Sequence, residues 1–348
     1  MAARKTTGSF FLCNSSCLKK FLEENKMKKI IAMLLAVMML FAIAACGNGD
    51  AGKADSATYT IGICQLVQHP ALDAATQGFK DAVIAELGED NVVFDEQNAS
   101  GDSATCATIC NGFASSQVDL IMANATPALQ AAVAATDTIP ILGTSVTEYG
   151  VALGIDNFDG TVGTNVSGTS DLAPLDQQAE MITELCPDAK NVGIIYCSAE
   201  ANSIYQAQVV KECLEAKNIN VTVYTFADSN DVSQVTKGAC ESNDVLYIPT
   251  DNTAASCTDA INAVAEPAGV PIIAGEEGIC SGCGIATLSI DYYELGVTTG
   301  KMAVKILTGE ANVADMAIEY YANPVKKYNA DLASALNIDI PEGYEAIA

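Results

Sequence analysis

Two kinds of segment alternate along most of the chain. Short runs rich in apolar and β-branched residues are followed by segments whose apolar residues recur at helical spacing. The runs predict strands at 59–64, 92–96, 120–124, 139–144, 191–196 and 220–226, and the spaced segments predict helices at 71–86, 103–116, 127–135 and 203–216. Continuous apolar strands separated by helices indicate parallel sheets that are covered on both faces.

This strand and helix pattern occurs twice in the sequence. The segment 118–122 followed by Thr126 parallels 243–247 followed by Asp251, and 138–142 parallels 269–273. Offsets of 125 to 131 residues exceed the period of a solenoid and predict two similar lobes. We therefore expect an α/β fold with two doubly wound parallel-sheet lobes, between which the carboxyl ends of both sets of strands line a cleft.

The N-terminal segment differs from the rest of the chain. From Met27 it has two lysines, an apolar run over 30–45 and then Cys46, which is typical of an export signal and resembles the bacterial lipobox. We assign 1–26 to an extension outside the fold, 27–45 to a lipoprotein signal peptide, and 46–57 to a lipidated cysteine with a flexible tether. A diacylglycerol and a palmitate-like acyl chain on Cys46 would anchor the protein to the extracytoplasmic face of the cell membrane. An uncleaved signal anchor is the alternative.

The charge balance excludes several classes of partner. The whole chain has a formal net charge of -26, and after residue 45 it contains ten lysines, no arginine and 41 acidic residues. Nucleic acid is excluded because binding it requires a cationic surface. An anionic ligand held by the fork of an arginine side chain is excluded as well.

Ten cysteines follow Cys46, and we interpret most of them as small apolar residues inside strands and helices. Cys280 and Cys283 form a CxxC motif without a second pair or a nearby histidine, so we expect no metal site. Whether these two cysteines form a local disulfide stays open at this point.

Several polar segments resemble the tryptophan/tyrosine-type substrate-binding lipoproteins of ABC transporters. They occur in the family's order along the whole mature chain, with Thr147–Tyr149 departing from the family's frequent Thr-Asp-Pro. The matching segments are Ile61–Gln65, His69–Asp73, Gln97–Asp102, Ala125–Ala128, Asn165–Asp171, Glu200–Ser203, Pro249–Asn252 and Ile290–Gly296.

The resemblance implies a type I periplasmic-binding fold whose lobes are joined by three crossovers. It places the lobes at 58–164 with 288–319 and at 165–287 with 320–348, and the crossovers near 164–168, 286–290 and 318–322. The implied function is capture of a small ligand for an ABC permease and its ATPase. That ligand is an amino acid or an analogue, and the family includes aromatic ones. We expect a monomer without a cofactor.

Two other functions stay open. A protein of the same fold could report its ligand to a membrane receptor instead of a permease. A secreted hydrolase is disfavoured, because the chain has no GxSxG or Walker A motif and its single histidine is His69.

Candidate ligand-binding residues follow the predicted strands. Without arginine, a ligand carboxylate must be met by hydroxyl groups and by backbone N–H groups at helix N-termini. Asp251 is the predicted partner of the ligand's ammonium group, although it could instead cap the following helix. The full candidate set is Gln65, His69, Thr126, Thr144, Ser145, Ser198, Glu200, Asn202, Asp251, Asn252 and Asp291.

Overall fold

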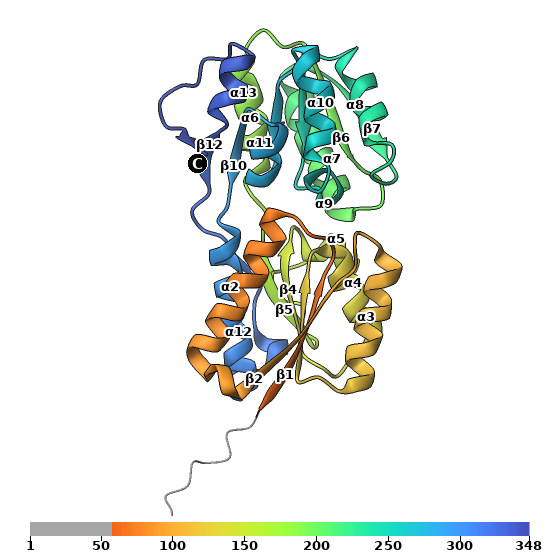
Figure 1. Cartoon of the computed structure of the whole chain (residues 1–348), viewed down its shortest axis with the longest axis vertical. Helices are drawn as coiled ribbons and strands as arrows, with labels where there is room; N and C mark the ends of the chain where they lie inside the picture. Colours follow the sequence, from red (N-terminus) through yellow and green to blue (C-terminus); the bar gives the residue numbers. More distant parts are fainter. Residues whose placement is uncertain (1–57, 348) are drawn as a thin grey trace, which may run out of the picture. The chain divides into compact units, whose positions relative to one another are not determined.

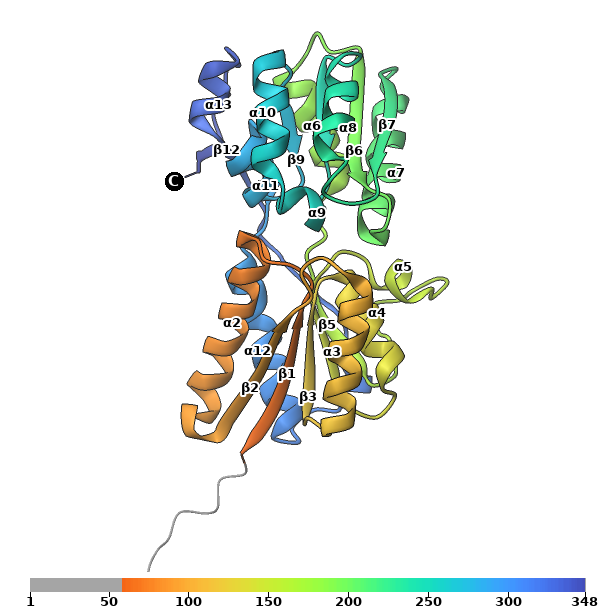
Figure 2. The same cartoon turned by 45° about the vertical axis from the view of Figure 1, so that its right-hand side comes forward.

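The computed structural model describes residues 58–347 and contains two sheets, each covered by helices (Figures 1 and 2). The first sheet consists of β1 (Tyr59–Gln65), β2 (Val92–Asn98), β3 (Leu120–Asn124), β4 (Ile141–Val146), β5 (Val166–Ser170) and β11 (Glu319–Tyr320). The second consists of β6 (Asn191–Cys197), β7 (Asn220–Phe226), β8 (Val245–Ile248), β9 (Ile272–Ala274), β10 (Ala286–Ser289), β12 (Val325–Tyr328) and β13 (Glu345–Ala346).

The helices divide between the two sheets. Those packed on the first sheet, together the first lobe, are α2 (Pro70–Leu87), α3 (Ser103–Ser116), α4 (Thr126–Ala135), α5 (Tyr149–Leu153) and α12 (Tyr292–Leu307). The second lobe contains α6 (Leu175–Leu185), α7 (Ala201–Ala216), α8 (Val232–Cys240), α9 (Asn252–Ala255), α10 (Thr258–Ala268), α11 (Glu277–Cys283) and α13 (Ala330–Ala335). Short 3-10 turns occur at Glu89–Asn91 and Val313–Asp315. Figures 1 and 2 show α2 and α12 side by side on one face of the first sheet.

Strand order confirms the internal repeat. The first sheet runs β11-β5-β4-β3-β1-β2 and the second β13-β12-β10-β9-β8-β6-β7, so β1 to β5 and β6 to β10 occupy equivalent places. All the pairings within each of these sets are parallel. The predicted α/β fold with two doubly wound lobes is therefore confirmed.

Burial explains which apolar runs became central strands. Every residue of β3 and β8 is buried, as expected for parallel strands covered by helices on both faces. The edge strands β2 and β7 are largely exposed and carry polar residues, which discourages pairing with another chain.

The chain passes between the two sheets three times, each time later than the predicted lobe boundary. β5 pairs with β4 in the first sheet, so the chain enters the second lobe after Ser170 and not at 164–168. β10 belongs to the second sheet, which moves the boundary from 287/288 to Ile290 and Asp291. β11 belongs to the first sheet and β12 to the second, which moves the last boundary from 319/320 to the segment 321–324. The boundary at 164/165 was wrong because β5, with the sequence VSGTS, is fully buried yet too polar to read as an apolar strand.

All ten cysteines in the described part of the chain are unpaired thiols, including Cys280 and Cys283 within α11. No group of three or more potential metal-binding side chains occurs among residues 58–347. Within the same residues, no helix has the length and apolar character needed to span a membrane. The predicted signal peptide, Cys46 and the tether lie outside the described residues.

Candidate functional site

Buried polar side chains without partners gather at the carboxyl ends of the strands. Within residues 58–347, six buried side-chain nitrogen or oxygen atoms have no hydrogen-bond partner, and all but Thr287 follow the end of a strand or lie on its last residues. We call the other five the strand-end cluster: His69 Nδ1 after β1, Asn124 Oδ1 on β3, Ser145 Oγ on β4, Asp171 Oδ1 after β5 and Asn202 Oδ1 after β6. Unsatisfied buried polar groups destabilise a fold, so a set of them at one place indicates a binding function.

Asp171 is the charged member of the strand-end cluster. Its Oδ2 accepts a hydrogen bond from the Tyr292 hydroxyl at 3.0 Å, and no hydrogen bond of ordinary geometry reaches its Oδ1. Burial raises the pKa of Asp171 to about 6, against the lowering effect of Thr147 and Tyr292. A buried carboxylate that has no cationic partner is suited to receive a ligand cation.

Two backbone positions beside the cluster are strained. Ala125 has φ 92° and Ser145 has φ 53°, in a region that residues with a side chain rarely adopt. Ala125 precedes α4, and Ser145 lies near the end of β4. Strained residues of this kind concentrate at binding and catalytic sites, where the surrounding structure holds them.

The structure brings together seven of the eleven predicted site residues. All seven are buried at strand ends: His69, Thr126, Ser145, Glu200, Asn202, Asp251 and Asn252. The two lobes are joined there by a 3.3 Å hydrogen bond between His69 Nε2 and Asn252 Oδ1. Residues of both lobes therefore contribute to the strand-end cluster.

Glu200 is held entirely by neighbours in its own lobe. Its Oε2 accepts hydrogen bonds from the backbone and side chain of Asn252 at 2.9 and 2.6 Å. Its Oε1 accepts from the backbone and hydroxyl of Thr253 at 2.9 and 2.8 Å. This carboxylate fixes the start of α9.

Asp251 likewise binds backbone atoms on both sides. Its Oδ1 accepts from Ala254 N at 2.8 Å and caps α9, while its Oδ2 accepts from Cys197 N at 2.7 Å and ties β8 to β6. Burial and the neighbouring Glu200 carboxylate raise the pKa of Asp251 to about 8. With both oxygens occupied, Asp251 has the helix-capping role that the sequence left as the alternative.

The other four predicted residues have local partners outside this set. Gln65 is buried but binds Val67, Asp73 and Thr76 within its own lobe. The hydroxyl of Thr144 lies within hydrogen-bond distance of the hydroxyls of Thr169 and Thr299, which tie β4 and β5 to α12.

The other two of these residues are exposed. Ser198 donates to Phe226 O, and Asp291 caps α12 through Glu294 N. Both have roles that the local hydrogen bonds explain without a ligand.

Sequence reasoning missed two carboxylates at the cleft. Asp171 was seen only as the end of a matching segment, although an acid directly after a run of small polar residues is the signal that could have identified it. Glu276 is not among the predicted site residues, yet it is buried and caps α11 by accepting from Gly278 N and Ile279 N. Burial raises its pKa to about 7.

Two cavities lined by both lobes lie beside residues that contact the strand-end cluster, namely Tyr292, which bonds Asp171, and Glu200, which bonds Asn202. One, of about 590 Å³, is lined by Pro70, Glu276 and Tyr292 among others. The other, of about 200 Å³, is lined by Pro127, Glu200 and Thr253 among others. Space for the body of a small molecule therefore exists between the lobes, next to residues that contact the cluster.

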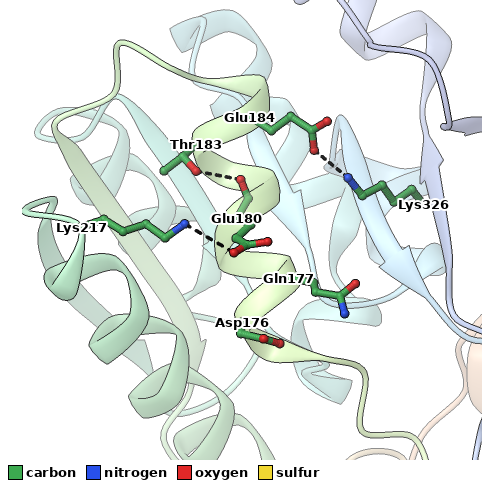
Figure 3. Close-up of a pocket in the computed structure, with 7 residues that line it drawn as sticks. All are labelled: Asp176, Gln177, Glu180, Thr183, Glu184, Lys217 and Lys326. Atoms are coloured by element: carbon green, nitrogen blue, oxygen red, sulfur yellow. Dashed lines mark hydrogen bonds and ion pairs between the residues drawn. The ribbon is translucent and has the colours of Figure 1, made fainter.

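A different groove, of about 630 Å³, lies over α6 (Figure 3). Two of its three carboxylates are already paired: Glu184 with Lys326 at 2.7 Å and Glu180 with Lys217 at 4.0 Å. These ion pairs are partly exposed to solvent, where such pairs contribute little. Because every residue that lines this groove belongs to the second lobe, we do not assign ligand binding to it.

Comparison with known proteins identifies the family of this chain. The sequence model of the family described as ABC transporter substrate binding protein matches residues 60–348. Over 325 residues the chain is 35% identical to the tyrosine-binding protein of Clostridioides difficile (strain R20291), covering 90% of this chain and 93% of that protein.

Two solved structures are also similar. One is the ABC domain from Streptococcus pneumonia in complex with L-Trp, with 30% identity, a TM-score of 0.79, and coverage of 84% of this chain and 100% of that chain. The other is the ligand-free, open structure of a substrate-binding protein with adhesive properties from Clostridium difficile, with 38% identity, a TM-score of 0.64, and coverage of 83% and 99%. The chain belongs to the family of ABC transporter substrate-binding proteins.

Proposed function

We propose that this protein captures an aromatic α-amino acid between its two lobes and delivers it to an ABC permease and its ATPase. The observation that carries the proposal is the strand-end cluster, in which buried polar atoms of both lobes have no partner. A ligand that contacts both lobes also favours their closed arrangement, which a partner can recognise.

The chemistry of the site suits a zwitterion. Asp171 offers a buried carboxylate to an ammonium group. The Ser145 hydroxyl, the buried Thr126 and the backbone N–H groups at the start of α4 offer donors to a carboxylate. The described residues contain no arginine, so these neutral donors have to serve in its place.

The aromatic side chain is proposed from the relatives. One is named a tyrosine-binding protein, and another was crystallised with L-Trp. The cavity that adjoins Tyr292 could receive such a ring, because aromatic and apolar side chains line part of it.

A thermal-shift screen of the purified protein tests the proposal. A ligand at 100 times its dissociation constant stabilises the folded state by about 2.7 kcal/mol, or roughly 5 °C for a protein of this size. We expect L-tyrosine or L-tryptophan to give such a shift in a dose-dependent way, and myo-inositol and glucose to give none. A sugar that stabilises the protein while every amino acid fails would contradict the proposal.

We further propose that Cys46 carries the lipid anchor. We expect labelled fatty acid to enter the wild-type protein in cells and to be absent from Cys46→Ser. Cys64→Ser serves as the control, because Cys64 is buried in the first lobe and cannot be an acceptor in the folded protein. Equal labelling of wild type and Cys46→Ser would contradict the anchor.

A further inference from the structure

The hydrogen bonds of Glu200 fix the orientation of a neighbouring amide. Asn252 Nδ2 donates to Glu200 Oε2 at 2.6 Å, and a carboxylate can only accept. The other end of that amide, Oδ1, is therefore an acceptor and faces His69 Nε2 at 3.3 Å. His69 must then carry its proton on Nε2.

The second ring nitrogen of His69 is left as a lone-pair acceptor. Burial lowers the pKa of His69, although Asn252, Glu200 and Asp73 oppose that effect, and these are the polar and charged groups that face the ring. The ring is 6% exposed, and Nδ1 has no partner. In a neutral imidazole that is protonated on Nε2, Nδ1 can accept one hydrogen bond and cannot donate one.

The amide members of the strand-end cluster are acceptors for the same reason. Asn202 Nδ2 donates to Glu200 Oε2 and to Thr250 O, which leaves Asn202 Oδ1 as the unpartnered end. Asn124 Nδ2 donates to Leu72 O at 2.8 Å and leaves its Oδ1 unpartnered. With Asp171, four of the five unpartnered atoms in the cluster can only accept hydrogen bonds when the carboxylate is ionised.

We propose that His69 Nδ1 is a specificity-determining acceptor, held in the correct tautomer by Asn252 and Glu200, for an N–H or O–H donor of the bound amino acid. The inference rests on the proposed function and deepens it, since it names the polarity that the ligand must present. The donor is either the ammonium group or the N–H or O–H of an aromatic side chain. A ligand that offers only acceptors at this place leaves all these groups unsatisfied and is rejected.

Nitrogen NMR of the imidazole tests this directly, because His69 is the only histidine in the chain. The protein is labelled with ¹⁵N-histidine, purified without a histidine tag, and titrated with L-tyrosine and L-tryptophan. We expect the neutral tautomer with Nε2 protonated before and after addition, and a shift of the Nδ1 resonance toward that of a hydrogen-bonded nitrogen. An Nδ1-protonated tautomer or an imidazolium in the complex would overturn the inference.

Ligand analogues identify the donor. L-phenylalanine keeps the ammonium group but has no side-chain donor, whereas 3-(4-hydroxyphenyl)propionate and indole-3-propionate keep the side-chain donor without the ammonium group. If the Nδ1 resonance moves with L-phenylalanine, the donor is the ammonium group; if it moves only with compounds that have a side-chain donor, that donor is the partner. If an amino acid binds and the resonance does not move, the inference fails while the proposed function stands. If no amino acid binds, the proposed function fails, and this inference fails with it.

The variant Asn252→Leu tests whether the Asn252 side chain sets the tautomer of His69. Without the amide, we expect both neutral tautomers of His69 to be populated and the affinity to fall about 10- to 100-fold. The matched control is Asn111→Leu on the exposed face of α3, for which neither the His69 signals nor the affinity should change. A single Nε2-protonated tautomer in folded Asn252→Leu would show that Asn252 does not set the tautomer.

Discussion

Replacing Asp171 with asparagine is expected to weaken binding of the amino acid by roughly 2–5 kcal/mol, the range measured when one partner of a buried charge pair is lost. Asparagine has nearly the same shape, and its side-chain oxygen can still accept the hydrogen bond from Tyr292. The change therefore removes the negative charge from the cleft and leaves the packing intact. Calorimetric titration of the two proteins with the same ligand measures the difference.

The same substitution is expected to stabilise the protein when no ligand is bound. In the folded state the pKa of Asp171 is about 6, above the value of 3.8 for an unperturbed aspartate. The folded state therefore holds the proton more tightly, and this group's contribution to stability is lost as the pH rises from about 4 through 6. At pH 8 this lowers the free energy of unfolding of the wild-type protein by about 3 kcal/mol relative to low pH. Asp171→Asn has no group that titrates there and should keep this stability.

A matched control is Asp176→Asn. Asp176 lies only five residues away but is exposed on α6, so neither the affinity nor the dependence of stability on pH should change. If Asp171→Asn binds as tightly as wild type, Asp171 is not the ammonium partner. Unfolding in urea at several pH values measures the stability of both variants.

Replacing Asp251 with alanine is expected to lower the free energy of unfolding by roughly 2–5 kcal/mol. The carboxylate is the acceptor for two buried N–H groups, on Cys197 and Ala254, and each unsatisfied buried group costs about 1–3 kcal/mol. The midpoint of urea unfolding at an unchanged m-value measures the loss.

Asp102→Ala provides the comparison for Asp251→Ala. Asp102 caps α3 in the same way but is exposed to solvent, so water can replace it and the cost should be near 1 kcal/mol. If Asp251→Ala unfolds at the same urea concentration as wild type but no longer binds the amino acid, Asp251 and not Asp171 is the ligand's partner.

The contrast between Asp171 and Asp251 shows what the sequence could not supply. Both acids follow a strand, and both therefore lie at the edge where the ligand of a doubly wound lobe binds. Only the tertiary hydrogen bonds distinguish them, because Cys197 and Ala254 occupy both oxygens of one while Tyr292 reaches a single oxygen of the other. The sequence predicts where polar side chains lie. It does not predict which of them already have hydrogen-bond partners within the protein.

More of the fold than of the site could be predicted from the sequence. β8 is apolar throughout, β3 is apolar up to Asn124, and helices such as α3 begin at a capping residue, so local pattern sufficed to predict them and the repeat that they form. β5 escaped prediction because it owes its burial to the helix α12 and to β4, which are distant in sequence. The error in the boundary at 164/165 follows from that one strand.

The most direct test is a crystal structure of the protein with L-tyrosine or L-tryptophan, whichever gives the larger thermal shift. We expect the ligand to lie between the two sheets with its nitrogen about 2.7–3.2 Å from Asp171 Oδ1, in hydrogen-bond range. A ligand bound in the groove over α6, or bound between the lobes with its carboxylate toward Asp171, would contradict it.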